Sequence, residues 1–264
     1  MPSRKFKPVK PQPAAPWRWA NGAVALIRAP LEWIGRNEQS VLIALLLIVL
    51  ALWGFWTLAG EVGEGGTKRF DEWVLRSLRR ADDPAKPLGP DWLAEVGRDM
   101  TALGGIAVLT MLTLAVAGFL WLRRMYGAMW LVLVATLGGL LVSTLLKNSF
   151  DRPRPSLVPH LTSVYTSSFP SGHSMLSAVV YLTLGALLGR FVSQLRLKAY
   201  FLLIALLLTI IVGVSRVYLG VHYPTDVLAG WAAGLAWALA CWLVARLLQK
   251  RGAVEEDTDS KEAA

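Results

Sequence analysis

The chain has 264 residues, of which 55% are hydrophobic and 17% charged, and its 27 Lys and Arg against 18 Asp and Glu give a formal net charge of +9. Soluble domains contain about 45–50% apolar and about 25% charged residues. With a mean hydropathy of +0.47, the chain has too little polar surface to enclose a water-soluble core. This argues against a disordered chain, a disulfide scaffold and an ordinary cytosolic enzyme, and favours one membrane domain.

The segment before the first long apolar run is basic and interrupted. Residues 1–16 hold four Lys or Arg and five Pro, which is typical of a disordered arm. Residues 17–36 mix Trp, Leu and Ile with charges and Pro30, so we expect an amphipathic helix on the inner membrane surface. The first long apolar run begins at Val41, too late for a cleaved signal peptide. Residues 1–40 are therefore expected to be an arm and an interfacial helix.

Six apolar runs follow, each close to the roughly 20 residues that cross a bilayer. They are residues 41–60, 100–122, 125–146, 174–189, 199–215 and 227–245. We therefore expect an all-α fold, a six-transmembrane helical bundle over residues 41–248, followed by an acidic disordered tail at 249–264. Glycines four residues apart, Gly230 and Gly234, are expected to let two helices pack closely.

The placement of Lys and Arg predicts the orientation of the bundle. With the N-terminus inside, 16 Lys and Arg lie on the inner side and 11 on the outer side. Seven of those 11 lie in the long outer loop 61–99, beside nine acidic residues. The bias in the short loops favours cytoplasmic N- and C-termini. The positive charge is therefore explained mostly by membrane topology, and we expect no nucleic-acid partner.

The outer loop 61–99 contains one helical pattern. Phe70, Trp73, Val74 and Leu78 fall at i, i+3, i+4 and i+8, which predicts an amphipathic helix with these side chains on its apolar stripe. The polar remainder is expected to consist of Asp71, Glu72, Arg76, Arg79 and Arg80. Packing at the membrane interface is the favoured role for this helix, and a lid or lipid-entry element is the alternative.

One group of ionisable residues at or near span ends falls on the outer face in this topology: Lys147, Arg154, His173, Arg216, His222 and Asp226. Such residues are expensive at membrane depth and usually functional. Two spans start on this face, so their free N–H groups favour an anion, and Gly172 lets the backbone approach it closely. Lys147, Arg154 and Arg216 add three positive charges, and the arginine fork matches tetrahedral oxyanions. The pattern predicts a phosphate site.

Two histidines supply chemistry that binding alone does not require. His222 and Asp226 are four residues apart at a helix start, so they share a face. Asp226 can accept a hydrogen bond from one imidazole nitrogen and leave the other with its lone pair. His173, at the start of another span, can donate a proton to a leaving group. Together these groups indicate phosphoryl transfer through a phosphohistidine.

Three motifs between residues 147 and 226 carry a resemblance to a known superfamily. They are Lys-x6-Arg-Pro at Lys147–Pro155, Pro-Ser-Gly-His at Pro170–His173, and Ser-Arg-x5-His-x3-Asp at Ser215–Asp226. In these the chain resembles the type 2 phosphatidic acid phosphatase and vanadium haloperoxidase superfamily, in its branch of bacterial integral membrane lipid phosphatases. Arg154 fills the arginine position of the first motif. Arg152, at a shorter spacing, is expected to be a charge at the entrance of the site.

The resemblance implies a role for each motif residue. It makes His222 the nucleophile, Asp226 the residue that orients it, and His173 the acid that protonates the leaving group. The phosphate oxygens would be held by Lys147, Arg154, Ser171, Gly172 and Arg216. No metal and no cofactor is implied. His160 matches no motif, and we expect it to be a solvated loop residue.

The expected function is hydrolysis of a lipid phosphate at the periplasmic or extracellular face of the inner (plasma) membrane. By family analogy undecaprenyl diphosphate is the first substrate hypothesis, followed by phosphatidylglycerophosphate, phosphatidic acid and lipid A phosphate. Phosphotransfer to a second lipid at the same site is an alternative, and so is a lipid-phosphate binder or transporter without hydrolysis. Haloperoxidase chemistry with bound vanadate is disfavoured by the six spans.

Overall fold

The computed structural model describes residues 39–162 and 166–250. The predicted arm and interfacial helix, and all of the acidic tail beyond Lys250, lie outside these residues. The chain divides into two units, residues 1–43 and 44–264. Of the first unit only residues 39–43 are described, and they form the start of a helix. The rest of that helix and all later elements belong to the second unit.

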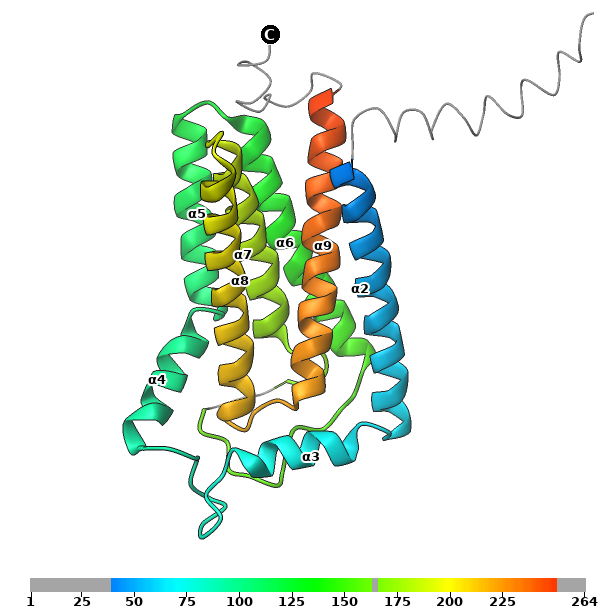
Figure 1. The fold of residues 1–264 in the computed structure, drawn as a ribbon, viewed down its shortest axis with the longest axis vertical. Coiled ribbons are helices and arrows are strands. Elements are labelled where there is room, and N and C mark those ends of the chain that lie inside the picture. Colours follow the sequence, from blue (N-terminus) through cyan, green and yellow to red (C-terminus); the bar gives the residue numbers. More distant parts are fainter. Residues whose placement is uncertain (1–38, 163–165, 251–264) are drawn as a thin grey trace, which may run out of the picture. The chain divides into compact units, whose positions relative to one another are not determined.

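Every regular element in the described part of the chain is a helix, which confirms the all-α expectation (Figure 1). In chain order the helices are α2 (Gln39–Glu64), α3 (Lys68–Ser77), α4 (Asp91–Ala102), α5 (Ile106–Leu122), α6 (Tyr126–Ser149), α7 (Gly172–Arg190), α8 (Leu195–Tyr218) and α9 (Pro224–Lys250). Extended pairing among these residues is limited to one isolated bridge between Arg79 and Pro87.

Five helices are long and apolar enough to cross a membrane, namely α2, α6, α7, α8 and α9. They coincide with five of the predicted runs to within a few residues. The sixth predicted run, 100–122, is not one continuous helix. It is divided between α4 and α5, which are bent by 44° relative to each other. The described residues therefore contain five candidate spans, or six if α4 and α5 form one broken span.

The break between α4 and α5 includes Gly104 and Gly105, and the backbone makes a close approach at Gly104. A Cβ atom at this position would lie 2.4 Å from Cγ1 of Val212 in α8 and 3.3 Å from the carbonyl oxygen of His173 in α7. Glycine is the residue that permits such an approach. Hydropathy gave no sign of the break, because the run 100–122 contains no charged residue.

Helix α7 is central to the bundle, since it packs against α5, α6, α8 and α9. Its contact with α9 depends on the predicted pair of glycines. Cβ atoms at Gly230 and Gly234 would each lie 2.6 Å from a carbonyl oxygen, those of Ser171 and Met175 respectively. The expected close packing is confirmed, and it places the first turn of α7 beside the second and third turns of α9.

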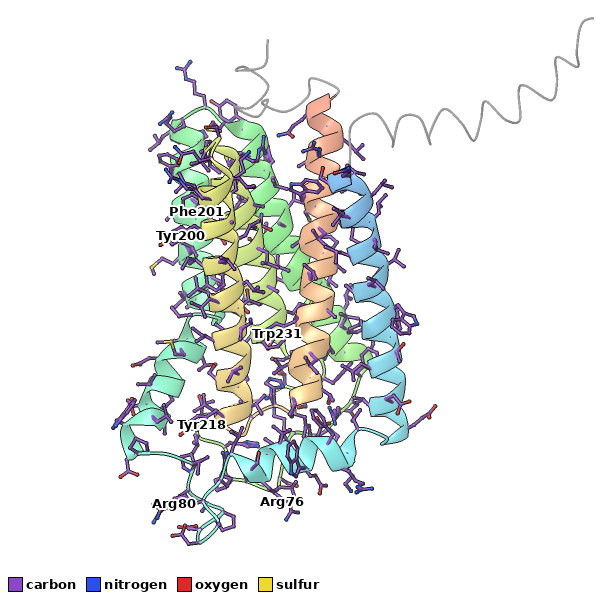
Figure 2. The ribbon with its side chains drawn as sticks, in the orientation of Figure 1. Arg76, Arg80, Tyr200, Phe201, Tyr218 and Trp231 are labelled. Carbon is purple, nitrogen blue, oxygen red and sulfur yellow. The ribbon has the colours of Figure 1, made fainter. Side chains whose placement is uncertain are left out.

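Polar contacts join α8 to α9 and to the loop before α4. The indole Nε1 of Trp231 in α9 donates to the carbonyl oxygen of Thr209 in α8, at 3.2 Å (Figure 2). At the end of α8, the Tyr218 hydroxyl donates to the carbonyl of Leu88, at 2.9 Å. These contacts hold the turn between α8 and α9 in place.

Helix α3 crosses the end of the bundle at which α8 ends and α9 begins, and it packs on α9 (Figure 1). Its existence was predicted correctly, but the burial of Asp71, which was expected on its polar side, was not. Phe70 and Trp73 of the predicted apolar stripe are 47% and 66% exposed, whereas Asp71 and Leu75 are fully buried. Arg79, just beyond the helix, is also buried. A partly polar face turns inward because its charged groups find polar partners on the bundle.

Candidate active site

One cavity at this end of the bundle gathers residues from all three sequence motifs. It has a volume of about 1130 Å³ and extends from polar loop residues to apolar side chains of the spans, among them Ile106, Leu140 and Leu176. The predicted site residues in its lining are Lys147, Arg154, Gly172, His173, Arg216 and His222. Positions 75 residues apart in sequence are thus brought to one cavity.

Two of the three predicted cations, Lys147 and Arg154, donate hydrogen bonds to backbone carbonyls around the cavity. Nζ of Lys147 donates to the carbonyl oxygen of Ser167 at 2.9 Å. Arg154 donates through Nε to the carbonyl oxygen of Thr166 and through Nη1 to that of Val221, each at 2.7 Å. Partial burial lowers the pKa of the Arg154 guanidinium below its ordinary value. An anion in the cavity would therefore stabilise its charge.

The third cation, Arg216, is buried at the end of α8. Its Nη1 donates to the hydroxyl of Thr101 at 2.9 Å, and its Nε has no hydrogen-bond partner in the described part of the chain. A buried charge that meets only neutral groups is costly. The described partners of Lys147 and Arg154 are also neutral. The cavity thus concentrates positive charge, and a phosphate group would neutralise it.

His222 is 1% exposed and lies between these cations and Asp226. Its Nδ1 is 3.3 Å from Oδ2 of Asp226, and its Nε2 is 3.3 Å from Nη1 of Arg154. Because a carboxylate only accepts, Nδ1 carries the proton and Nε2 keeps its lone pair. Burial lowers the pKa of His222 below its ordinary value, although Asp226 opposes this. The arrangement places an imidazole nitrogen that keeps its lone pair beside the guanidinium of Arg154 at the cavity.

The turn between α8 and α9 sets the position of this imidazole. Gly220 adopts a φ of +73°, a conformation that side-chain-bearing residues rarely take. Pro224 then opens α9 with a φ already suited to a helix. Oδ2 of Asp226 accepts a hydrogen bond from the backbone N–H of Tyr223 at 2.9 Å. Asp226 therefore stabilises the helix start and contacts His222 with the same carboxylate.

The second motif provides His173 and the start of α7. His173 lies in the first helical turn and lines the cavity with His222. Gly172 also lines the cavity, and a Cβ there would lie 3.1 Å from Cε of Lys147. Ser171 differs from the expectation, because its Oγ caps α7. It accepts from the N–H of Ser174 at 3.4 Å and from the Ser174 hydroxyl at 2.8 Å. The cavity lining does not include it.

The expectation that Arg152 is an entrance charge is wrong. Its side chain is only 14% exposed, and it donates through Nη2 to Asp71 at 2.7 Å and through Nη1 to Asp226 at 2.5 Å. Its Cζ also lies 4.2 Å from the ring centroid of Tyr223. Burial opposes its charge, but the two carboxylates outweigh this and raise its pKa. Arg152 is a structural partner of the predicted orienting carboxylate.

Sequence reasoning missed three polar residues of this network. Asp71 accepts from Arg152, the Ser168 hydroxyl donates to Asp226, and Thr101 accepts from Arg216. The only signal for Asp71 was its place on a predicted surface helix, which suggested the opposite burial. His160, as expected, is exposed and lies outside the cavity lining.

The fold and the cavity define an integral membrane protein, all-helical where described, with a cationic pocket that holds two histidines. Residues 127–250 match the model of the PAP2 superfamily. The chain is 38% identical over 185 residues to phosphatidylglycerophosphatase B of Bacillus subtilis, covering 69% of this chain and 86% of that protein. The chain therefore belongs to the PAP2 superfamily, as its motifs indicated.

Two further similarities agree with this assignment. The crystal structure of the transmembrane PAP2-type phosphatidylglycerolphosphate phosphatase from Bacillus subtilis superposes with a TM-score of 0.67 at 30% identity, covering 77% of this chain and 96% of that one. The undecaprenyl-diphosphatase of Sulfolobus acidocaldarius is 33% identical over 86 residues, which is 33% of this chain and 36% of that protein. The relatives named here are membrane lipid phosphatases or pyrophosphatases.

Proposed function

We propose that this PAP2-superfamily protein hydrolyses a lipid mono- or diphosphate through a phosphohistidine formed on His222. The observation that carries the proposal is the position of the His222 Nε2, which keeps its lone pair, lies 3.3 Å from Nη1 of Arg154 and lines a cavity with three cations whose described partners are neutral. A site that only bound phosphate would need the cations but would have no use for an oriented neutral imidazole.

In the proposed first step, Lys147, Arg154 and Arg216 hold the phosphoryl oxygens and Nε2 of His222 attacks phosphorus. The bond to the leaving oxygen breaks, and His173 gives that oxygen its proton. The imidazole ring becomes positively charged in this step, and the Asp226 carboxylate beside Nδ1–H stabilises it. In the second step His173 takes a proton from water, whose oxygen attacks phosphorus and releases inorganic phosphate from Nε2.

The proposed substrate is a lipid because the cavity has two chemically different parts. Its cations lie at the end of the bundle, whereas Ile106, Leu140 and Leu176 line it with apolar groups from the spans. A phosphorylated head group and the start of a hydrocarbon tail match these two parts. The names of the relatives favour phosphatidylglycerophosphate and undecaprenyl diphosphate over phosphatidic acid as substrates. The bias of Lys and Arg supports a site on the outer face of the inner membrane.

The test is phosphate release by the purified protein in detergent with EDTA, over a panel of these lipids. We expect release by the wild type, no release by His222→Ala, and unchanged release by His160→Ala, which removes an exposed histidine outside the cavity. Trapped wild-type enzyme should carry an acid-labile phosphoryl group that His222→Ala lacks. Release by His222→Ala at the wild-type rate would overturn the proposal, and a newly phosphorylated acceptor lipid would favour phosphotransfer instead.

A further inference from the structure

A carboxylate outside the three motifs, Asp71, binds the same arginine as the predicted orienting residue Asp226. Asp71 belongs to α3, which lies outside the residues matched by the superfamily model. It is 1% exposed, and its Oδ1 accepts from the backbone N–H of Thr225 at 3.2 Å. Its Oδ2 accepts from the Thr225 hydroxyl and from Nη2 of Arg152, both at 2.7 Å. Asp71 is thus bound to the first turn of α9 and to Arg152.

The guanidinium of Arg152 donates hydrogen bonds to two carboxylates, one through each of its terminal nitrogens. Nη2 binds Asp71, and Nη1 binds Oδ1 of Asp226. The other oxygen of Asp226, Oδ2, is the atom that lies 3.3 Å from Nδ1 of His222. In this arrangement Arg152 binds only Oδ1 of Asp226, whereas Oδ2 faces the imidazole and also accepts from the Ser168 hydroxyl and from the backbone N–H of Tyr223.

An arginine beside a single carboxylate favours a bidentate pair, in which two N–H groups bind both oxygens. Without Asp71, Nη2 of Arg152 would be free to bind Oδ2 of Asp226. It would then compete with His222 for the same acceptor. The imidazole would lose the partner that fixes its tautomer and stabilises its positive charge during attack.

We propose that Asp71 is a positioning residue for the reaction, which holds one arm of the Arg152 fork and so keeps Oδ2 of Asp226 available to His222. The inference rests on the proposed function, since it gives Asp226 and His222 the roles described above. It extends the functional unit to a helix of the first outer loop. Asp71 acts through two other side chains and is absent from the cavity lining, so it does not contact the substrate.

The kinetic test compares four proteins: Asp71→Asn, Arg152→Gln, the double variant, and Glu72→Gln. Glu72 is the adjacent carboxylate on α3 and pairs with the exposed Lys68 and Arg76, so its variant is a matched control with the same change of charge. Asp71→Asn should lower kcat by about tenfold, near the lower end of what losing such an outer partner costs. KM should stay close to its wild-type value.

The double variant gives the decisive result, because it removes the competing guanidinium together with Asp71. It should recover most of the kcat that Asp71→Asn loses. A purely structural role predicts the reverse, with two lost contacts harming the enzyme at least as much as one. A double variant no faster than Asp71→Asn would overturn the proposal. If Asp71→Asn does not fold, the double variant is compared with Arg152→Gln, and a large kcat difference between these two would equally overturn it.

A second readout does not depend on activity. The ring tautomer of His222 is read from its ¹⁵N chemical shifts in histidine-labelled protein, with His222→Ala to assign the signals. Protonation at Nδ1 should dominate in the wild type and in Glu72→Gln, and should decrease in Asp71→Asn. An unchanged tautomer in Asp71→Asn would contradict the inference. If the wild type released no phosphate, the proposed function would fail while this measurement still tested the positioning of His222.

Discussion

Nη1 of Arg154 lies 3.3 Å from Nε2 of His222, while Nδ1 of the same ring lies 3.3 Å from Asp226. The two nitrogens of one buried imidazole therefore face a cation and a carboxylate. A phosphoryl group held by Arg154 would have its phosphorus next to the nitrogen that keeps a lone pair. In the proposed mechanism, the cation that binds the phosphoryl group is therefore adjacent to the nitrogen that attacks it.

Asp226→Asn is expected to keep the geometry of the site while lowering kcat by about 10²–10⁴, the range for carboxylates that orient a catalytic histidine. An amide can bind Nδ1 in either tautomer and brings no negative charge to stabilise the imidazole during attack. The measurement is kcat for phosphate release, with the binding of lipid phosphate measured in parallel. Wild-type kcat in this variant would remove Asp226 from the mechanism.

Inorganic phosphate is expected to raise the Tm of the wild type more than that of Arg216→Gln. The buried Arg216 guanidinium meets only the neutral hydroxyl of Thr101 among the described residues, so a bound anion supplies its missing counter-charge. A ligand that binds the native state stabilises it by RT ln(1 + [L]/Kd).

Thermal unfolding in detergent, with phosphate titrated against a sulfate-free and phosphate-free reference, measures this difference. Arg76→Gln serves as the control, because Arg76 is exposed on α3 and pairs with Glu72 (Figure 2). An equal response of Tm to phosphate in the wild type and in Arg216→Gln would show that Arg216 takes no part in anion binding.

The protein is expected to lose stability as the pH falls below about 6.5, the ordinary pKa of histidine. Burial lowers the pKa of His222 in the native state, so between its two pKa values the unfolded chain binds more protons than the folded one. Stability then rises with pH across this window and is lost as the pH falls. The difference in Tm between pH 7.5 and pH 5 measures the effect.

His222→Gln should reduce that difference, whereas His160→Gln should leave it unchanged, since His160 is exposed. A pH dependence of Tm that was identical in the wild type and His222→Gln would mean that other groups determine the acid sensitivity.

The motif residues could be predicted from the sequence because their spacing is local and their chemistry unusual. Lys147, Arg216 and His222 stand at the ends of apolar runs, where a charge or an imidazole is conspicuous, and antiparallel spans bring such ends together. The tertiary ion pairs had no such signal. Asp71 and Arg152 are 81 residues apart, and nothing in the pattern of either segment indicates that they meet.

A missing local signal also accounts for the buried Asp71 of α3 and for the break in the second predicted span. Hydrophobic periodicity placed Asp71 on the polar side of α3 because it counts only apolar area, whereas the partners that Asp71 finds on α9 bury it. In the run 100–122 every residue is uncharged, so hydropathy predicts one helix. The break falls at Gly104 and Gly105, whose low helix propensity hydropathy does not register, and Gly104 lies close to Val212 of α8.

Gly104→Ala is expected to destabilise the protein, and we expect it to lower activity as well. Its Cβ would lie 2.4 Å from Val212 and 3.3 Å from the backbone oxygen of His173, so α7 and α8 would have to move apart. Such overpacking costs about 1–3 kcal/mol. The displacement would fall on the first turn of α7, which positions the predicted general acid, His173.

Gly118→Ala provides the matched control, because a Cβ there meets no atom within 4 Å and the residue lies inside α5. Alanine in place of glycine in a helix interior is worth up to about 1 kcal/mol, so Tm should rise or stay level. We expect Tm to fall in Gly104→Ala and to rise or stay level in Gly118→Ala. We expect kcat to fall only in Gly104→Ala. If Gly104→Ala were as stable and active as Gly118→Ala, the close approach at the break would not be needed to hold His173 in place.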